Sequence, residues 1–332
     1  MEDSNPGTTR EPEGITQGQL SNGAGVVSLP FSSPPSPLMG RMYERLASLC
    51  RGFSGAAYVS PAILLIAFVL VAPSIYGFYI SLHNIRYLRA EEFVGLENYE
   101  FLLSDPGFWP VVTRTLFFTV FAVGLTISVG LAVAIWINRL HGWFALLIQI
   151  LVILPWVVSN VVGALLFRWV FVNDIGIAVY MFEQIGIQFR PLADGTSAML
   201  MLIVFSLWRT LGFAVILLLS GLKSIPQDFF EAAHVDGASA WQRLTWVTLP
   251  MLRTPMLITL VVLTVSNLNN VESPLIVTGG GPADATNIAP LYLYSAAFTQ
   301  FDFNTAMAMG IGMFVANIFL ALAYVKLVAR DG

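Results

Sequence analysis

Charged residues are scarce in this chain. Only 11% of its 332 residues are Asp, Glu, Lys or Arg, whereas 56% are hydrophobic. Because a water-soluble domain carries about 25% charged residues, water cannot be the main solvent for most of this surface. The net charge of −4 provides no basic field, so we expect no nucleic-acid partner.

Cysteine and histidine are also scarce. The single cysteine, Cys50, can form no internal disulfide and has no neighbouring metal ligands, so we expect it to fill a small space near a membrane surface. His83, His141 and His234 lie in separate segments and form neither an HExxH motif nor part of a Ser-His-Asp group. The sequence therefore predicts no catalytic residue, no metal site and no cofactor held by this chain, which disfavours a membrane-embedded enzyme.

The first 40 residues contain no long apolar run. Pro, Ser, Gly, Thr and Glu dominate residues 1–40, and such a composition buries too little apolar surface to fold. A secretory signal would place an apolar core of about 7–15 residues near its start. We therefore interpret residues 1–40 as a disordered cytoplasmic tail, and we expect residues 41–57 to form an interfacial helix on the membrane surface.

Long apolar stretches, by contrast, are plentiful. A helix needs about 20 mainly apolar residues to cross about 30 Å of hydrocarbon, and six stretches meet this requirement. They are residues 58–80, 112–137, 144–170, 196–221, 254–277 and 303–327. The sequence thus predicts an all-α integral membrane domain with six transmembrane helices within residues 58–330. Gly, Pro, Ser and Asn interrupt the apolar runs, which indicates helices that pack against protein and line a polar path.

The 16 Lys and Arg residues are unevenly distributed among the connecting segments. Most of them fall on one side of the membrane if the N-terminus is inside. Since cytoplasmic loops carry an excess of Lys and Arg, both termini and the loop of residues 222–253 are predicted to be cytoplasmic.

The loop of residues 222–253 contains two patterns that start helices. Ser224 and Ser239 each precede a glutamine by three residues, as in a capping box. Gly237 can adopt a positive φ and end the first helix, and Pro250 is expected to close the second. We therefore expect two short helices set at an angle to each other.

Phenylalanines give the first of these helices an apolar face. Phe229 and Phe230 on a cytosolic loop need something to cover them. Docking into a groove of another protein meets that need, and so does lying on the lipid headgroups. The residues alone leave both interpretations open.

The same loop resembles the EAA loop of binding-protein-dependent ABC importer permeases. The runs that carry this resemblance are Glu231-Ala232-Ala233, Asp236-Gly237-Ala238 and Leu249-Pro250. Other stretches resemble the carbohydrate-uptake branch of the family, which is typified by maltose permeases. These are Phe93-Val94-Gly95-Leu96-Glu97-Asn98-Tyr99, Leu154-Pro155 and Thr278-Gly279-Gly280-Gly281-Pro282. The resemblance covers about residues 55–330.

The resemblance implies a transport subunit that is not itself an enzyme. Its coupling to an ATPase would be carried by five loop residues, Glu231, Ala232, Ala233, Asp236 and Gly237. The implied partners are a second permease subunit in a heterodimer, a cytosolic ATPase dimer that binds ATP and Mg, and an external solute-binding protein. The resemblance also implies that the protein is surrounded by membrane lipid and is located in the cytoplasmic (inner) membrane of a bacterium or archaeon.

Asparagines gather in the fifth predicted span. Asn267 and Asn270 are three residues apart and would share a helix face, and their amides can both donate to and accept from sugar hydroxyls. Hydrogen bonds between helices explain any single asparagine equally well. The resemblance to maltose-type permeases implies eight pathway positions: Trp156, Asn160, Ser206, Arg209, Thr210, Phe213, Asn267 and Asn270.

Arg209 departs from the family, because it stands where an apolar residue is expected. A guanidinium at mid-membrane depth must find an anion, carbonyl groups or water. It could contact an anionic solute such as a glycerol-phosphate-type compound, or it could pair locally with Glu272. The main functional interpretation is a sugar permease, and the alternative from another class is an ion-coupled secondary transporter. That alternative predicts matching broken helices in two halves of the chain, which the sequence does not reveal.

Overall fold

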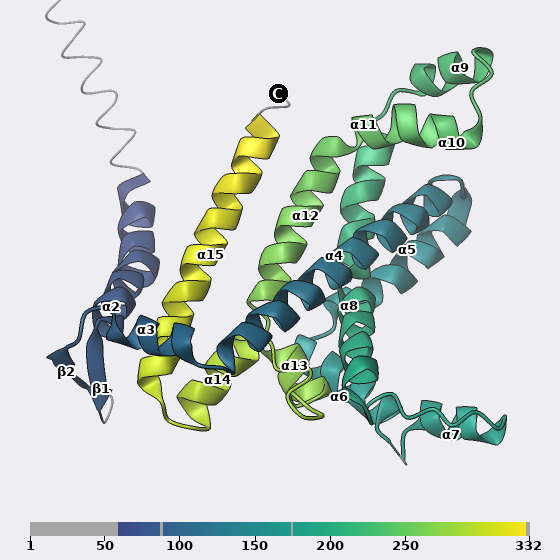
Figure 1. Cartoon of the computed structure of the whole chain (residues 1–332). Helices are drawn as coiled ribbons and strands as arrows, with labels where there is room; N and C mark the ends of the chain where they lie inside the picture. The colour runs from purple at the N-terminus through teal and green to yellow at the C-terminus, as the bar shows by residue number, and fades with distance from the viewer. Residues whose placement is uncertain (1–58, 87–88, 174, 330–332) are drawn as a thin grey trace, which may run out of the picture. The chain divides into compact units, whose positions relative to one another are not determined.

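The computed structural model describes residues 59–86, 89–173 and 175–329. The expected tail of residues 1–40, the interfacial helix of 41–57 and Cys50 lie outside the described residues. The chain divides after Ile66 into two compact units. The second unit, Ala67–Gly332, contains all the features discussed below except the start of the helix Val59–Ser81 (Figure 1).

Four of the six predicted spans are continuous helices. They are Val59–Ser81, which ends as α2 (Ala72–Ser81), α4 (Phe108–Asn138), α8 (Gly195–Lys223) and α15 (Phe303–Ala329). Within the described residues these four are long and apolar enough to cross a membrane. The number rises to six if each of two bent pairs counts as one span, namely Gly142–Val157 with Asn160–Phe171 and Ala240–Met251 with Arg253–Leu268. The prediction of a mainly helical membrane fold is therefore confirmed.

The third predicted span is not one helix. It consists of α5 (Gly142–Val157) and α6 (Asn160–Phe171), which meet at an angle of 100°. Pro155 removes one N–H donor from the last turn of α5, and the backbone is extended at Val158 and Ser159. The prediction of a continuous helix over 144–170 is therefore wrong, although its apolar content was correctly placed.

The fifth predicted span is also interrupted. Its helix α12 (Arg253–Leu268) ends before three non-helical residues, and α13 (Glu272–Val277) follows. Two side chains bind backbone carbonyls near the end of α12. Asn267 Nδ2 donates to the carbonyl of Leu263 (2.9 Å), and Asn269 Nδ2 donates to that of Val265 (2.7 Å). Asparagine competes in this way for helix carbonyls, so the continuous helix predicted over 254–277 is wrong.

A small hairpin, absent from the all-α prediction, follows the first helix. Its strands and the next helix are β1 (His83–Arg86), β2 (Arg89–Phe93) and α3 (Glu97–Ser104). The strands are antiparallel. Buried Asn98 closes the base of the hairpin, since its Nδ2 donates to the carbonyls of Ser81 (2.8 Å) and His83 (3.0 Å). This contact gives a structural reason for the asparagine in the Phe93–Tyr99 motif.

Helix α8 lies at the centre of the second unit. Half of its most apolar window is buried, against 17% for α15, and its residues Leu202 and Leu218 are fully covered by neighbouring helices. At Gly212 an added Cβ would lie 2.7 Å from the carbonyl oxygen of Val152 and 2.8 Å from Cα of Ile153. The backbones of α5 and α8 therefore come into direct contact at this glycine.

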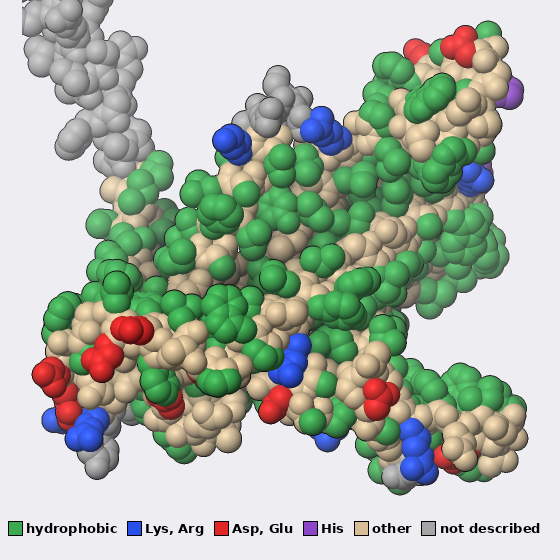
Figure 2. All heavy atoms as spheres, viewed as in Figure 1, with side chains coloured by type: hydrophobic (Ala, Val, Ile, Leu, Met, Phe, Trp, Pro, Cys, Tyr) green, Lys and Arg blue, Asp and Glu red, His purple; other side chains and the backbone are tan. Residues whose placement is uncertain are grey.

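Shorter elements lie at the two ends of the second unit. They are α7 (Ile177–Gln184), α9 (Gln227–Val235), α10 (Ala240–Arg243), a π-helical turn (Leu244–Thr248), α11 (Leu249–Met251) and α14 (Ala289–Phe298). Figure 1 shows α9 to α11 at the same end as the C-terminus of α15, with the hairpin, α7 and α14 at the other end. On the face shown in Figure 2, hydrophobic side chains cover the long helices and charged side chains gather towards the ends.

Candidate functional site

Arg209, near the middle of α8, binds the broken third span. Its Nε donates to Asn160 Oδ1 (2.9 Å), and its Nη1 donates to the carbonyl of Trp156 (3.2 Å). That carbonyl belongs to the last turn of α5, where the extended backbone leaves it without an intrahelical donor. The guanidinium thus satisfies a backbone group that the break exposes.

Asn160, the first residue of α6, connects this arginine to an acidic residue. Its Nδ2 donates to Glu272 Oε2 (2.7 Å) and lies 3.4 Å from Asn270 Oδ1. Asn270 Oδ1 also accepts from the backbone N–H of Ser273 (2.8 Å). The break after α12 therefore brings Glu272 to the network, and Glu272 is joined to Arg209 through the amide of Asn160.

A second polar group lies between α8 and the end of α12. Ser206 Oγ donates to Asn267 Oδ1 (2.7 Å), and Thr210 Oγ1 donates to the carbonyl of Ser206 (2.7 Å). Ser206 and Asn267 are buried, and each satisfies a polar atom of the other. Because α12 ends at Leu268, Asn267 and Asn270 do not share one helix face as predicted.

Aromatic rings border the arginine network. The ring centroids of Trp156 and Phe213 are 5.7 Å apart, with an interplanar angle of 37°. Trp156 is exposed, so part of its apolar surface is accessible beside the polar groups. All eight predicted pathway residues therefore lie along α8 and at the two helix breaks.

The first loop helix, α9, ends as the sequence predicts. Gly237 has φ +73° and its N–H donates to the carbonyl of His234 (3.0 Å), while the N–H of Ala238 donates to that of Ala233 (2.9 Å). These two bonds form a Schellman motif. Only glycine adopts this backbone conformation without steric cost, which accounts for Gly237 at the corner between the two helices.

The two predicted capping boxes have different outcomes. At α10, Gln242 N–H donates to Ser239 Oγ (3.3 Å) and Ser239 N–H donates to Gln242 Oε1 (2.8 Å), so this box is confirmed. Ser224 is not a cap of α9, because α8 continues to Lys223 and Ser224 Oγ donates to the carbonyl of Gly221 (2.8 Å). The first capping-box prediction is wrong.

Pro250 does not itself end the second helix. It lies within α11, which continues to Met251. The π-helical turn Leu244–Thr248 comes just before it, and a wider turn of this kind accommodates a proline that lacks an N–H donor.

The two phenylalanines of α9 have different surroundings. Phe230 packs against the core cluster that contains Leu222 and Ile225, so the chain itself covers it. Phe229 is 50% exposed and Val235 is 86% exposed. The apolar surface that still needs a cover is therefore formed by Phe229 and Val235, next to the residues of the EAA-like run.

Comparison with known proteins identifies the family. The sequence model described as "Binding-protein-dependent transport system inner membrane component" matches residues 124–331, more than half of the chain. The chain belongs to this family.

Individual permeases of known name support this assignment over most of the chain. The trehalose/maltose transport system permease protein MalF of Thermococcus litoralis is 30% identical over 82% of this chain and 92% of its own length. The sulfoquinovosyl glycerol transport system permease protein SmoG of Agrobacterium fabrum is 27% identical over 81% of this chain and 88% of its own length. The predicted resemblance to binding-protein-dependent permeases is thus confirmed.

The fold is also shared with a solved transporter. A chain of a bacterial alginate ABC transporter, in complex with an alginate pentasaccharide-bound periplasmic protein, superposes with a TM-score of 0.74 at 21% identity. The match covers 86% of this permease and 96% of that chain. The permease is accordingly a multi-pass membrane protein with the helical arrangement of an ABC transporter subunit.

Two residues of the network were not among the predicted pathway residues of this permease. Glu272 binds Asn160, and buried Ser273 donates its N–H to Asn270. The available signal was an acidic residue inside an apolar stretch. This signal made Glu272 a candidate partner of Arg209 but not a pathway residue, because the break after α12 that brings Glu272 to the network is not visible in the residue spacing.

No group of three His, Cys, Asp or Glu side chains within the described residues is arranged to hold a metal ion. The expectation that the permease itself holds no metal or cofactor stays a prediction.

Proposed function

We propose that this permease forms half of the translocation pathway for a neutral sugar or a related polyhydroxylated solute. The relative named as a trehalose/maltose permease supports a sugar. Amide and hydroxyl groups at the helix breaks can exchange hydrogen bonds with solute hydroxyls, and the exposed face of Trp156 can stack on the apolar face of a sugar ring. The pathway residues are the eight identified from the resemblance, with Glu272 added.

The observation that carries the proposal of a neutral solute is the bridge through Asn160. Its Oδ1 accepts from Arg209 and its Nδ2 donates to Glu272. One positive and one negative side chain are therefore joined within hydrogen-bonding contact, and the network carries no net charge to attract an anion.

An anionic sugar is the second candidate. The relative named for sulfoquinovosyl glycerol and the neighbour named for alginate favour it. Arg209 would then release its hydrogen bond to Asn160 and bind the solute instead, because a guanidinium binds carboxylate or phosphate through paired N–H donors.

Uptake by the assembled transporter distinguishes these candidates. We expect labelled trehalose or maltose to be taken up with ATP consumption, and sulfoquinovosyl glycerol and alginate oligosaccharides to be excluded. If only the anionic compounds are taken up, and Arg209→Gln abolishes that uptake, the solute is an anionic sugar. ATP-independent uptake by this chain alone would instead indicate an ion-coupled transporter.

We further propose that Glu231, Ala232, Ala233, Asp236 and Gly237 contact a cytosolic ATPase, which binds ATP and Mg. Apart from half-buried Ala233 these residues are exposed, and a short helix with apolar neighbours is suited to a groove of another protein. The remaining partners in this proposal are a second, different permease subunit and an external solute-binding protein. The periplasmic protein bound to the alginate transporter supports the last of these.

A further inference from the structure

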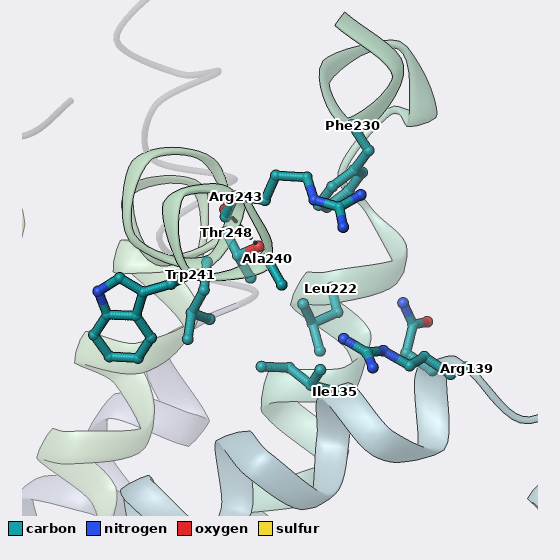
Figure 3. A pocket seen from close by; sticks show the side chains of 10 residues that line it. Ile135, Arg139, Leu222, Phe230, Ala240, Trp241, Arg243 and Thr248 are labelled. Atoms are coloured by element: carbon teal, nitrogen blue, oxygen red, sulfur yellow. Dashed lines mark hydrogen bonds between the residues drawn. The ribbon is translucent and has the colours of Figure 1, made fainter. Parts of the chain in front are cut away.

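A cavity of about 770 Å³ lies between the cytoplasmic loop and the ends of α4 and α8. Figure 3 shows its walls, which come from three separate parts of the chain. The residues that matter for its chemistry are Ile135, Arg139, Leu222, Trp241, Arg243 and Leu244.

Two arginines give this cavity its charge. Arg139 follows the last residue of α4 and is exposed, while Arg243 ends α10 and is half-buried. No Asp or Glu is among the described residues that line the cavity. Within the described part of the chain, neither guanidinium has an ion pair or a side-chain hydrogen bond. A partly buried cation without a partner is costly, so the cavity has a charge that an anion would satisfy.

The remaining lining is largely apolar. Ile135 and Leu222 contribute side chains from the ends of the two long helices (Figure 3). Leu244 also lines the cavity, from the loop. A small free anion would leave this surface uncovered. An occupant with an anionic group and an attached hydrocarbon chain would contact both the arginines and the apolar wall.

The position of the cavity along the long helices also favours contact with lipid headgroups. It is located where the apolar helices α4 and α8 end, and Trp241, which is 71% exposed, is among its lining residues. Trp143 and Trp246, which follow Arg139 and Arg243 closely in the sequence, are also exposed. Tryptophan is enriched at the boundary between hydrocarbon and water, so the surrounding surface fits contact with the membrane interface.

We propose that this cavity binds an anionic phospholipid. Its phosphate lies between Arg139 and Arg243, and the start of an acyl chain lies on Ile135, Leu222 and Leu244. Bound in this way, the lipid connects the coupling loop to the ends of α4 and α8, and therefore supports the position of the loop relative to the membrane helices.

Native mass spectrometry of the full chain, released from nanodiscs, tests the proposal. We expect retained phosphatidylglycerol and little retained phosphatidylcholine, with affinity falling about fivefold for each of Arg139→Gln and Arg243→Gln. Lys326→Gln is the matched control, because it removes one positive charge at the same end of the molecule without lining the cavity. Equal retention of phosphatidylglycerol by the wild type and by the variant that carries both substitutions would overturn the proposal. Displacement of the lipid by inorganic phosphate at an equal concentration would overturn it as well.

A second measurement does not depend on the folding of any variant. A photoactivatable phosphatidylglycerol added to the wild-type chain should label peptides that contain residues 135–139 and 240–248. Labelling that avoids both peptides would contradict the proposal. Loss of this labelling in a complex purified with the ATPase would also contradict it, because the cavity would then belong to that interface.

Discussion

Asn160 is the residue on which the polar network depends. One amide accepts from Arg209 and donates to Glu272, so neither charged residue can be removed without leaving the other unbalanced. The sequence identifies the arginine as unusual and Glu272 as a candidate partner, but it does not identify Asn160 as the residue between them. The three residues are brought together by two helix breaks rather than by helical spacing.

Neutralising either Arg209 or Glu272 alone should lower the free energy of unfolding more than neutralising both. Arg209→Gln or Glu272→Gln alone is expected to lower stability by about 1–3 kcal/mol through an unsatisfied polar group, with reduced uptake. The double variant should recover part of both losses. Thermal unfolding in detergent and sugar uptake measure the two effects, and additive losses in the double variant would show that the bridge has no energetic role.

The close contact at Gly212 leads to a second prediction, which concerns the stability of the fold. Gly212→Ala places a methyl group against the backbone of Val152 and Ile153, so α5 and α8 must separate. Overpacking of this kind costs about 1–3 kcal/mol. Gly124→Ala in α4 is the control, since an added Cβ there contacts nothing within 4 Å, and it should leave the unfolding temperature unchanged or raise it.

At the scale of elements, hydropathy located the helices but not their interruptions. The first break, at Val158 and Ser159, lies inside an apolar stretch, and the second, at Asn269 to Val271, lies inside a stretch that is apolar overall. A hydropathy window long enough to find a span averages over both breaks. The relevant physical signals were local, namely Pro155 in α5 and the competing asparagines at the end of α12. The hairpin of residues 83–93 was not predicted because tertiary contacts hold it. Asn98 bonds its base, and Asn304 Oδ1 on α15 accepts from the N–H of Ile85 (2.7 Å).

Two serines in the loop of residues 222–253 provide a matched pair of substitutions. Ser239→Ala removes an observed cap and should destabilise α10 by about 1 kcal/mol, whereas Ser224→Ala removes no cap. Hydrogen exchange in the loop is the measurement. We expect faster exchange over residues 240–248 in the first variant alone, and equal exchange in both variants would contradict the assigned cap.

The corner between the loop helices is expected to transmit force. Gly237→Pro removes the N–H that donates to His234, and Glu231→Lys reverses a charge in the proposed contact with the ATPase. Both should reduce transport while leaving membrane insertion intact. ATP hydrolysis that continues without solute uptake is the expected result in a reconstituted complex, and normal uptake in either variant counts against the coupling role.

At the scale of the whole molecule, the permease is expected to function only in an assembly. It should co-purify with a second permease and an ATPase, and the loop substitutions should weaken retention of the ATPase alone. Affinity purification from membranes, followed by mass spectrometry, measures this. Retention of the ATPase independent of residues 228–240 would place the contact elsewhere.

The 100° turn between α5 and α6 has a consequence for mutational scanning. The carbonyl of Trp156 in the last turn of α5 accepts from Arg209 instead of from an intrahelical donor, and a passing solute that displaces Arg209 can bind this carbonyl as it binds side-chain oxygens. Alanine substitution leaves this carbonyl unchanged. A scan of side chains would therefore underestimate what this part of the chain contributes to solute selection, and backbone amide-to-ester replacement in α5 would be needed to measure the remainder.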